Sequence, residues 1–281
     1  MELRRSDGSV VAVDIAGEPD ATPVLVCHGL ADSRMSADWF EPAARELGLC
    51  VIVPDRPGSG GTDLRRMSRL EDWVYDATLV LDAYRADAAA LLGISGGGPF
   101  AAACAAVIPD RVRSLTLIAP LGAPGWPTGG MAAGERASLA LARRAPAFGG
   151  WVLGGLAALA RRSPRLFFRL VTTELPDADI RALRYPGVRE SFLASYVEAF
   201  RRGSGGVAQD LRVLTRPWGF DLGSIKVPAL IRQGDADLTV PVQHARRYAE
   251  AIPGARLHID PGHGHFSIFS TPREILAGLA G

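Results

Sequence analysis

The stretch "LLGISGGGPFAAAC", residues 91–104, joins an apolar segment typical of a buried strand to an alanine-rich segment typical of a helix. One serine and four glycines stand in and beside the junction. Consecutive glycines are costly to order, because glycine loses more conformational freedom on folding than any other residue. The turn must therefore either bring its backbone close to a ligand phosphate or adopt a conformation that other residues avoid.

Two phosphate-binding motifs fit this turn poorly. A P-loop requires a lysine after its second glycine, whereas Gly98 is followed by Pro99. The dinucleotide fingerprint is closer, since Gly96, Gly98 and Ala101 match G-x-G-x-x-G/A, but it requires an acidic residue at the end of the next strand. The next strand-like segment, 114–122, contains no acidic residue. The sequence therefore disfavours phosphate binding at this turn.

The pattern G-x-S-x-G over residues 93–97 predicts a nucleophile elbow, a sharp strand-to-helix turn that exposes a serine hydroxyl. Ser95 would sit in strained backbone, so its neighbours two before and two after must be small, and Gly93 and Gly97 meet that demand. Pro99 would fall in the first helical turn, where its missing N–H costs little. The N-terminus of that helix would direct N–H groups at an oxyanion beside Ser95. Glycine is so common in this chain that the pattern needs its structural context to carry weight.

The composition indicates one large globular domain, or a domain with an insert. The 281 residues are 48% hydrophobic, which suffices for a sizeable core. The formal net charge of +1 argues against nucleic acid as a partner. The first ten residues contain no apolar segment typical of a secretory signal. Cys27, Cys50 and Cys104 lie in apolar segments without metal-binding spacing, so we expect reduced core residues of a cytoplasmic protein.

One uncharged run, residues 145–160, lies between the pairs Arg143-Arg144 and Arg161-Arg162. It falls short of the roughly 20 residues of a membrane span, and its glycines weaken it as an isolated helix. We expect a buried helix or a lid element, with contact to a membrane surface as the alternative and no stable membrane span.

Strand-like and helix-like segments alternate along most of the chain. A hairpin with its turn at Asp7 and Gly8 is followed by strand-like segments at 23–29, 49–55, 89–95, 114–120, 228–234 and 256–260. Helix-like segments lie at 36–48, 68–84, 98–108, 241–252 and from 272 onward. Apolar strands separated by helices predict a doubly wound α/β fold with a mostly parallel, eight-stranded sheet that is buried on both faces.

The interval 122–216 interrupts this alternation with several helix-like segments and no good strand. It contains 14 arginines, no lysine and 7 acidic residues, a net charge of +7, which leaves −6 for the remainder. We predict a helical cap over 122–221, inserted after the sixth strand into a catalytic core of 1–121 and 222–281. Two roles are open for its arginines: attraction of anionic substrates, or solvation of exposed helix faces.

The strand ends offer the other groups that a serine nucleophile needs: a base, an acid that orients the base, and donors for an oxyanion. Asp235 and Asp237 follow one strand, and His263 and His265 follow the next. The chain order of serine, aspartate and histidine is the order expected for an elbow serine in such a sheet. The segment "HGLADSR" after Cys27 is placed to give the second oxyanion donor.

Five segments resemble successive signatures of the α/β-hydrolase fold superfamily, in its small-molecule serine hydrolase branch with a helical cap. They are "HGLADSR", "PDRPGSGGTD", "GISGGGPFAAACAAVIPDRV", "GDADLTVP" and "PGHGHFSIF". The resemblance covers 1–121 and 222–281, whereas 122–216 resembles the family only as a helical cap at the expected place. Proline iminopeptidases usually carry tryptophan after the elbow serine, where this chain has Gly96. Haloalkane dehalogenases and epoxide hydrolases carry aspartate at the position of Ser95.

The resemblance implies a catalytic triad of Ser95, His265 and Asp237. It places the orienting acid three residues after the strand-end glycine, at Asp237, which leaves Asp235 to cap the turn. It places the base between a glycine and an apolar residue, at His265, with His263 as the alternative.

The resemblance also implies that the backbone N–H groups of Gly96 and Leu30 form the oxyanion hole. The candidate substrate-pocket residues are His28, Arg56, Trp126 and His263. His28 has a structural alternative as a hydrogen-bonding residue of the oxyanion loop, and Arg56 as the partner of Asp55 in an internal salt bridge. No metal and no organic cofactor is implied.

These features predict a serine esterase that cleaves a small or medium ester, lactone or thioester with an apolar acyl part through an acyl-enzyme. The expected partner is a small-molecule substrate, and the oligomeric state stays open, with a homodimer among the alternatives. Because a fold does not fix a function, three alternatives remain on the same fold. They are C–C bond cleavage, a non-hydrolytic biosynthetic cyclase or lyase, and a receptor-like ligand-binding protein that retains the triad.

Overall fold

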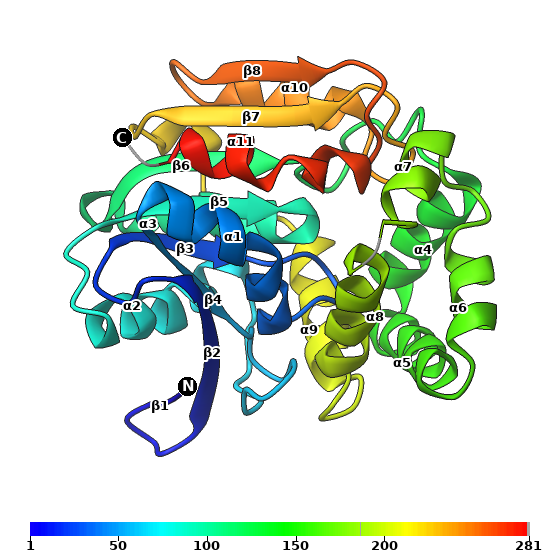
Figure 1. The fold of residues 1–281 in the computed structure, drawn as a ribbon, viewed down its shortest axis with the longest axis horizontal. Helices are drawn as coiled ribbons and strands as arrows, with labels where there is room; N and C mark the ends of the chain where they lie inside the picture. Colours follow the sequence, from blue (N-terminus) through cyan, green and yellow to red (C-terminus); the bar gives the residue numbers. More distant parts are fainter. Residues whose placement is uncertain (186, 280–281) are drawn as a thin grey trace.

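The computed structural model describes residues 1–185 and 187–279, which form an eight-stranded sheet with helices on both faces (Figure 1). The strands are β1 (Glu2–Arg4), β2 (Val10–Gly17), β3 (Thr22–Cys27), β4 (Leu49–Pro54), β5 (Ala89–Ile94), β6 (Val112–Ile118), β7 (Ala229–Gly234) and β8 (Arg256–Asp260). Their order in the sheet is β1-β2-β4-β3-β5-β6-β7-β8. β2 pairs antiparallel with β1 and β4, and all pairs from β4 to β8 are parallel. The predicted fold class is confirmed.

The leading hairpin forms where the sequence predicts it. Gly8 has a φ of +84°, a left-handed conformation that glycine adopts without steric cost. The carboxylate of Asp7 accepts the N–H of Ser9 at 2.9 Å, which closes the turn.

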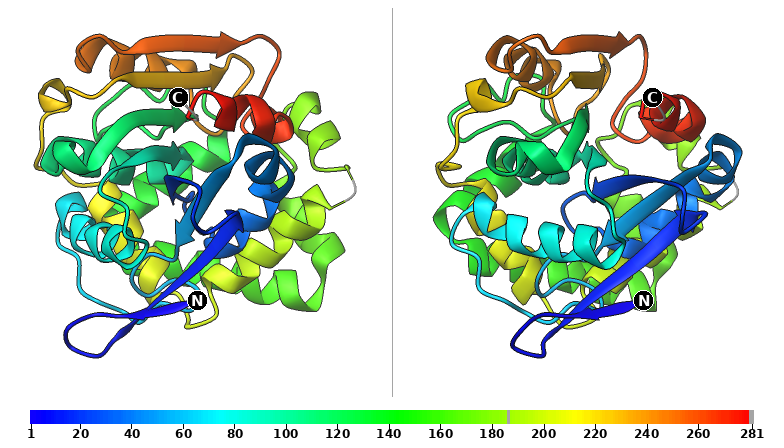
Figure 2. Two further views of the ribbon diagram at one scale, coloured as in Figure 1. Left: turned by 60° about the vertical axis from the view of Figure 1, so that its left-hand side comes forward. Right: turned by 90° about the vertical axis from the view of Figure 1, so that its left-hand side faces the viewer.

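The helices outside the interval 122–216 lie in two layers. They are α1 (Ala37–Leu47), α2 (Val74–Ala83), α3 (Gly98–Val107), α10 (Val242–Ala251) and α11 (Pro272–Ala277). Short 3₁₀ turns are η1 (Arg34–Ser36), η2 (Leu70–Trp73), η3 (Ser95–Gly97), η4 (Pro109–Arg111), η5 (Leu222–Ser224) and η6 (Ser267–Ser270). α1 and α11 pack together on one face of the sheet, and α2, α3 and α10 cover the other (Figure 2). Both faces of β4 and β5 are therefore buried, which explains their unbroken apolar sequences.

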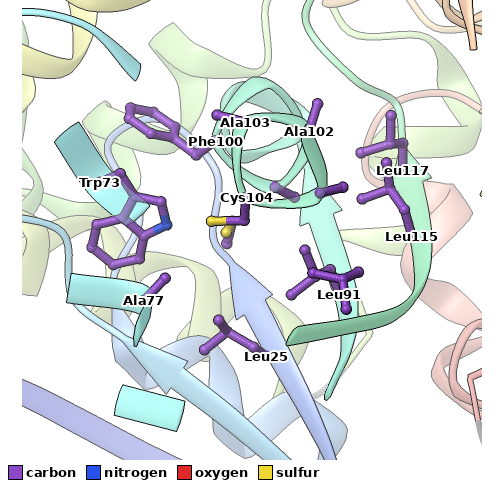
Figure 3. Close-up of a cluster of buried hydrophobic side chains, with 14 of the residues drawn as sticks. Leu25, Trp73, Ala77, Leu91, Phe100, Ala102, Ala103, Cys104, Leu115 and Leu117 are labelled. Atoms are coloured by element: carbon purple, nitrogen blue, oxygen red, sulfur yellow. The ribbon is translucent and has the colours of Figure 1, made fainter. Parts of the chain in front are cut away.

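The alanine-rich helix α3 lies in the larger core. Figure 3 shows Ala103 and Cys104 of this helix among Trp73, Leu91 and Leu25. The three cysteines are free and buried, as the sequence predicts, and burial raises the pKa of Cys27 to about 11. Small side chains on α3 let the helix lie close to the strands, which brings its N-terminus to the end of β5.

Between β6 and β7 the described residues form helices joined by loops, and these helices stand at the carboxyl ends of the parallel strands (Figure 1). The helices are α4 (Ala133–Arg144), α5 (Pro146–Arg162), α6 (Pro164–Val171), α7 (Asp177–Ala182), α8 (Val188–Ala199) and α9 (Gly205–Leu214). We call residues 133–214 the helical insert. It has an apolar cluster of its own, which includes Phe167, Tyr196 and Phe200.

The uncharged run of residues 145–160 forms most of α5, and only one side of this helix is buried. Gly149 and Ala157 face the interior, whereas Phe148 and Trp151 are exposed. The expectation of a buried helix therefore holds for one face only. Within residues 1–185 and 187–279, no helix combines the length and apolar character needed to cross a membrane.

The variant Gly97→Ala tests the packing of the turn after β5. A Cβ at position 97 would lie 2.0 Å from the carbonyl oxygen of Cys27, so we expect a loss of stability of about 3 kcal/mol or more. Gly155→Ala is the matched control, because a Cβ on Gly155 meets nothing within 4 Å and alanine favours a helix by about 0.5–1 kcal/mol. Urea unfolding of both variants measures the difference. Wild-type stability of Gly97→Ala would contradict the packing described.

Candidate active site

The predicted nucleophile elbow forms between β5 and α3. Ser95 has a φ of 51°, in the left-handed region that residues other than glycine seldom adopt. A Cβ on Gly93 would lie 2.8 Å from the Cβ of Ala101, and a Cβ on Gly97 would lie 2.0 Å from the carbonyl oxygen of Cys27. Both glycines are therefore required by close packing, one against α3 and the other against the end of β3.

The two candidate oxyanion donors lie against each other beside this elbow. A Cβ on Gly96 would lie 3.1 Å from the backbone N of Leu30, so the two backbone segments are in close contact. A Cβ on Gly29 would lie 3.8 Å from the Cβ of Ser95. Ala31, with a φ of 54°, turns the chain directly after Leu30. Two segments distant in the sequence thus come into contact next to one serine.

His265 and Asp237 form a buried hydrogen-bonded pair. Nδ1 of His265 is 2.8 Å from Oδ2 of Asp237. Oδ1 of Asp237 accepts the N–H groups of Thr239 and Val240 at 2.8 Å each, and Oδ2 also accepts Nε2 of Gln233 at 2.9 Å. These bonds fix the carboxylate in place. Because the carboxylate accepts a hydrogen bond from Nδ1–H, the other imidazole nitrogen, Nε2, is the proton acceptor.

The surroundings of His265 raise its pKa above the ordinary value. Burial has the largest single effect and opposes protonation, but the carboxylates of Asp237, Asp179 and Glu135 together outweigh it. Among the described residues, the hydroxyl of Ser95 makes no hydrogen bond with His265. The two residues share one edge, because β5, β6, β7 and β8 are consecutive parallel strands.

The alternative base and acid lie outside this pair. Nδ1 of His263 is 3.1 Å from the carbonyl oxygen of Pro261, within its own loop. Asp235 accepts the N–H of Gly262 at 2.7 Å and so caps the turn that leads to His265, in the role that the sequence favours.

His28 and Arg56 are both buried, each with only 1% of its surface exposed. Nε of Arg56 donates to Asp210 of α9 at 2.8 Å, and its other nitrogens donate to the carbonyls of His28 and Gly29 at 2.6 and 2.7 Å. These bonds favour the structural alternative for each residue, and a place for either in the substrate pocket stays a prediction. Asp210 lies far away in the sequence, and nothing local indicates that it neutralises Arg56.

The salt bridge expected between Asp55 and Arg56 does not form. Asp55 instead pairs with Arg34 at 2.7 Å and accepts the N–H of Gly61 at 2.8 Å. Arg34 also reaches Glu198 of α8 at 2.7 Å. The loop after β4 is thus fixed through the helical insert as well as through its own turn.

Trp126 lines a cavity between the segment after β6 and the helices α4, α9 and α10. The cavity has a volume of about 210 Å³ and is lined by Leu121, Trp126, Arg136, Leu139, Arg143 and His244, among others. The lining does not include Ser95, Asp237 or His265. Burial lowers the pKa of His244 to about 4, and its ring is fixed by Gly122 N–H at 3.0 Å. The position of Trp126 therefore does not place it against the reacting groups.

Asp179 of the helical insert holds the segment that carries His265. Its buried carboxylate accepts the backbone N–H groups of His265, Phe266 and Ser267 at 2.8, 2.9 and 2.7 Å. A Cβ on Gly264 would lie 2.4 Å from this carboxylate, so only glycine lets it approach. The backbone of the candidate base is therefore fixed by a side chain from the insert.

Ser195 of α8 contacts the loop that carries the second oxyanion donor. Its hydroxyl donates to Asp32, accepts the N–H of Ser33 at 3.0 Å, and lies 2.9 Å from the Ser33 hydroxyl. Asp32 in turn accepts the N–H of Gly29 at 3.2 Å. Burial raises the pKa of Asp32, although these donors oppose the rise. The loop after β3 is thus also attached to the insert.

Glu135, in the first turn of α4, is close enough to His265 and Asp237 for their charges to affect one another. Burial raises the pKa of its carboxyl group, the charge of His265 lowers it, and Asp237 raises it again. The N-terminus of α4 is brought here by a hydrogen bond of 2.7 Å from Ala132 N–H to the carbonyl of Leu238.

Sequence reasoning missed Asp32, Glu135, Asp179 and Ser195. Asp32 stands inside a recognised motif, but only the backbone of that motif was given a role. Asp179 lies two residues after Asp177, and no local pattern separates them. The sequence does offer one signal. The interval 122–216 has 14 arginines but only 7 acidic residues, and two of these acidic residues, Glu135 and Asp179, raise the pKa of His265.

The elbow and the sheet together define the α/β-hydrolase class of proteins. A family model described as "alpha/beta hydrolase fold" matches residues 22–272. The chain therefore belongs to the α/β-hydrolase fold family. It is 28% identical over 265 residues to the uncharacterized hydrolase YcgS of Bacillus subtilis (strain 168), covering 92% of this chain and 89% of that protein. It is 30% identical over 250 residues to a 2-hydroxymuconate semialdehyde hydrolase of Pseudomonas putida, covering 87% and 81%.

Solved structures show the same fold. A hydrolase from Pseudomonas aeruginosa PA01 superposes with a TM-score of 0.72 at 22% identity, over 100% of this chain and 98% of that one. The enol-lactonase from Burkholderia xenovorans LB400 superposes with a TM-score of 0.68 at 22% identity, over 96% and 98%. At this level of identity the likeness concerns the fold alone.

Replacing Asp179 with asparagine tests whether this carboxylate positions His265. The neutral amide weakens charge-assisted bonds worth about 1.5–3 kcal/mol, so we expect kcat for p-nitrophenyl acetate to fall about tenfold or more with little change in KM. Asp177→Asn, exposed on the same helix, removes the same charge and should leave both constants unchanged. A purely structural role would lower the stability of Asp179→Asn without lowering kcat of the folded enzyme.

Replacing Glu135 with glutamine should move the acid limb of the kcat/KM profile to lower pH. Glu135 stabilises protonated His265, so its neutralisation lowers the pKa of that histidine. The histidine then remains an unprotonated base at lower pH, and activity persists further into the acid range. Glu190→Gln, at an exposed site on α8, is the control. An unchanged acid limb in Glu135→Gln would exclude this coupling.

Proposed function

We propose that the protein is a serine hydrolase that acts through Ser95, His265 and Asp237. The observation that carries the proposal is the buried 2.8 Å hydrogen bond between His265 and Asp237, at the sheet edge where Ser95 stands in left-handed backbone. The membership of the chain in the α/β-hydrolase fold family supports hydrolysis as the type of reaction.

The proposed reaction proceeds through an acyl-enzyme. Nε2 of His265 takes the proton of the Ser95 hydroxyl as Oγ attacks the substrate carbonyl carbon. The N–H groups of Gly96 and Leu30 donate to the resulting oxyanion. The intermediate collapses, and His265 gives its proton to the departing oxygen or sulfur.

Hydrolysis of the acyl-enzyme completes the cycle. His265 takes a proton from a water molecule, whose oxygen attacks the acyl carbon. The second oxyanion collapses, the acid leaves, and the proton returns to Ser95. Asp237 stays ionised throughout and stabilises the imidazolium that forms twice.

The proposed substrate is a small or medium ester, lactone or thioester with an apolar acyl part. The insert that stands over the strand ends, and that we propose to act as a lid over 122–221, contains many apolar side chains. Glu135 adds a partly buried carboxyl group near the reacting atoms, which disfavours an anionic substrate there.

Cleavage of a C–C bond is the second candidate function. It is favoured by the relative named as a 2-hydroxymuconate semialdehyde hydrolase, because that name specifies a semialdehyde and not an ester. The same triad and oxyanion donors would serve both reactions. A panel that contains activated esters, lactones and 2-hydroxymuconate semialdehyde separates the two by the ratio of their kcat/KM values.

The triad variants test the proposal. Ser95→Ala should abolish turnover of p-nitrophenyl acetate, and His265→Ala and Asp237→Asn should each lower kcat by about 10³ or more. His263→Ala and Asp235→Asn are the matched controls and should cost far less. Circular dichroism and thermal unfolding check that each variant is folded.

Two results would count against this function. Substantial activity of Ser95→Ala would exclude the nucleophile. A wild-type protein that is labelled at Ser95 by a fluorophosphonate but turns over no substrate of the panel would favour a receptor-like binding protein, or a cyclase or lyase, on the same fold.

A further inference from the structure

The outward face of α5 is apolar and exposed. Phe148, Trp151 and Val152 are 52%, 70% and 40% exposed, and the two aromatic rings stack with centroids 6.1 Å apart. Together with Gly155 and Arg162, these residues recur at the three- and four-residue spacing of one helix face. The exposed face of a surface helix normally carries polar side chains, so this apolar stripe indicates a site of contact.

The neighbouring helix α6 extends the apolar surface. α6 packs against α5, and both lie at the edge of the insert away from the sheet (Figure 1). Phe167 is buried in the insert, whereas Leu166 and Leu170 on the other side of α6 are 45% and 52% exposed. Two consecutive helices thus direct large apolar side chains into solvent.

Arginines surround these side chains, and no acidic residue neutralises them. The interval 136–173 contains seven arginines and no aspartate or glutamate. All seven are exposed, and Arg136 donates to the carbonyl oxygen of Met131. The other six are Arg143, Arg144, Arg161, Arg162, Arg165 and Arg169. In the described part of the chain, none of these six forms an ion pair or hydrogen bond through its side chain. We call these six arginines, with Phe148, Trp151, Val152, Leu166 and Leu170, the basic apolar face.

The face also contains a hollow next to the exposed tryptophan. It has a volume of about 560 Å³ and is lined by Trp151, Val152, Gly154, Gly155, Arg161, Phe200, Gly203 and Ser204. An apolar floor beside a free guanidinium suits a molecule that has both an acyl chain and an anionic group.

We propose that the basic apolar face binds the surface of a bilayer that contains anionic phospholipids. Indole, phenyl and leucine side chains enter the boundary between headgroups and acyl chains, while guanidinium groups bind the headgroup phosphates. A nucleic acid would engage the arginines but leave Trp151, Leu166 and Leu170 without a partner. A purely apolar protein surface would bury six unpaired positive charges. The combination of charge and exposed apolar groups therefore favours an anionic bilayer over both.

The geometry defines how the protein would lie. α5 has 17 residues, its last turn carries Arg161 and Arg162, and Arg143 and Arg144 of α4 precede it, so the helix lies along the surface and does not cross it. The insert stands at the carboxyl ends of the strands, and the bilayer would therefore contact the insert and not the outer helices of the sheet (Figure 1). The inference does not depend on the reaction proposed for Ser95.

Co-sedimentation of the full chain with vesicles tests the proposal. Vesicles of phosphatidylcholine with phosphatidylglycerol should bind the protein, and vesicles of phosphatidylcholine alone should bind it much more weakly. Raising the salt from about 0.05 to 0.5 M should weaken the binding, because it screens charges at the surface. The tryptophan fluorescence should shift to the blue on binding, and Trp151→Phe should reduce that shift while it preserves binding.

Two double variants address the two parts of the face. Phe148→Ser with Trp151→Ser removes apolar groups, and Arg161→Gln with Arg162→Gln removes two charges. Each should lower the partition coefficient about tenfold or more. Arg66→Gln with Arg246→Gln removes two exposed charges elsewhere, and Val107→Ser with Leu257→Ser removes exposed apolar groups elsewhere. These controls should bind as the wild type does.

Three results would overturn the proposal. The first is equal binding to neutral and anionic vesicles, or binding to neither at low salt. The second is the same loss of binding in the control variants. The third is a concentration-dependent dimer that disappears in Phe148→Ser with Trp151→Ser, which would assign the face to a second copy of the chain. Since all substituted side chains are exposed, each variant should retain the unfolding temperature of the wild type.

Discussion

The contact between Gly97 and the carbonyl oxygens of Cys27 and His28 is the constraint on which the rest of the site depends. A Cβ at position 97 would lie 2.0 and 2.4 Å from these oxygens, so the turn after β5 reaches the end of β3 only as glycine. This approach brings Gly96 against Leu30 and forces Ser95 into left-handed backbone. The strain at the serine is tolerated because packing on both sides of the turn leaves it no other conformation.

The helical insert is bonded to the loops that carry the candidate triad base and the candidate oxyanion donor. Asp179 of α7 accepts hydrogen bonds from the backbone of the segment that carries His265. Ser195 of α8 is hydrogen-bonded to the loop after β3. Asp210 of α9 forms an ion pair with Arg56, which donates hydrogen bonds to two carbonyl oxygens of that same loop. Each link is buried and involves at least one charged group or a chain of hydroxyls, so each depends on position to within tenths of an ångström. A movement of the insert would therefore change the geometry of the base and of the oxyanion donors together.

Acidic and basic side chains of the insert lie on different sides of it. Its few acidic residues include Asp179 and Asp210, which are buried against the core, and Glu135, which acts on His265. Its unpaired arginines point outward from α4, α5 and α6. The net charge of +7 over 122–216 therefore describes the outer surface and not the site, where carboxylates raise the pKa of His265. The arginines consequently serve contact with the surroundings better than attraction of an anion to Ser95.

The sheet and the elbow could be predicted from local patterns in the sequence. Apolar runs with turn residues between them indicate strands and helices locally. The spacing of Gly93, Ser95 and Gly97 indicates a nucleophile elbow, because this turn requires small residues two positions before and after the serine. The choice of His265 over His263 came from a family resemblance, and the hydrogen bond to Asp237 agrees with it. The partner of Arg56 and the carboxylate that holds the His265 segment come from distant parts of the chain, and only the folded structure reveals them. A buried charge is stable only when a partner of opposite charge or hydrogen-bonding groups lie against it. That partner can stand anywhere in the sequence, so no local sequence pattern identifies it.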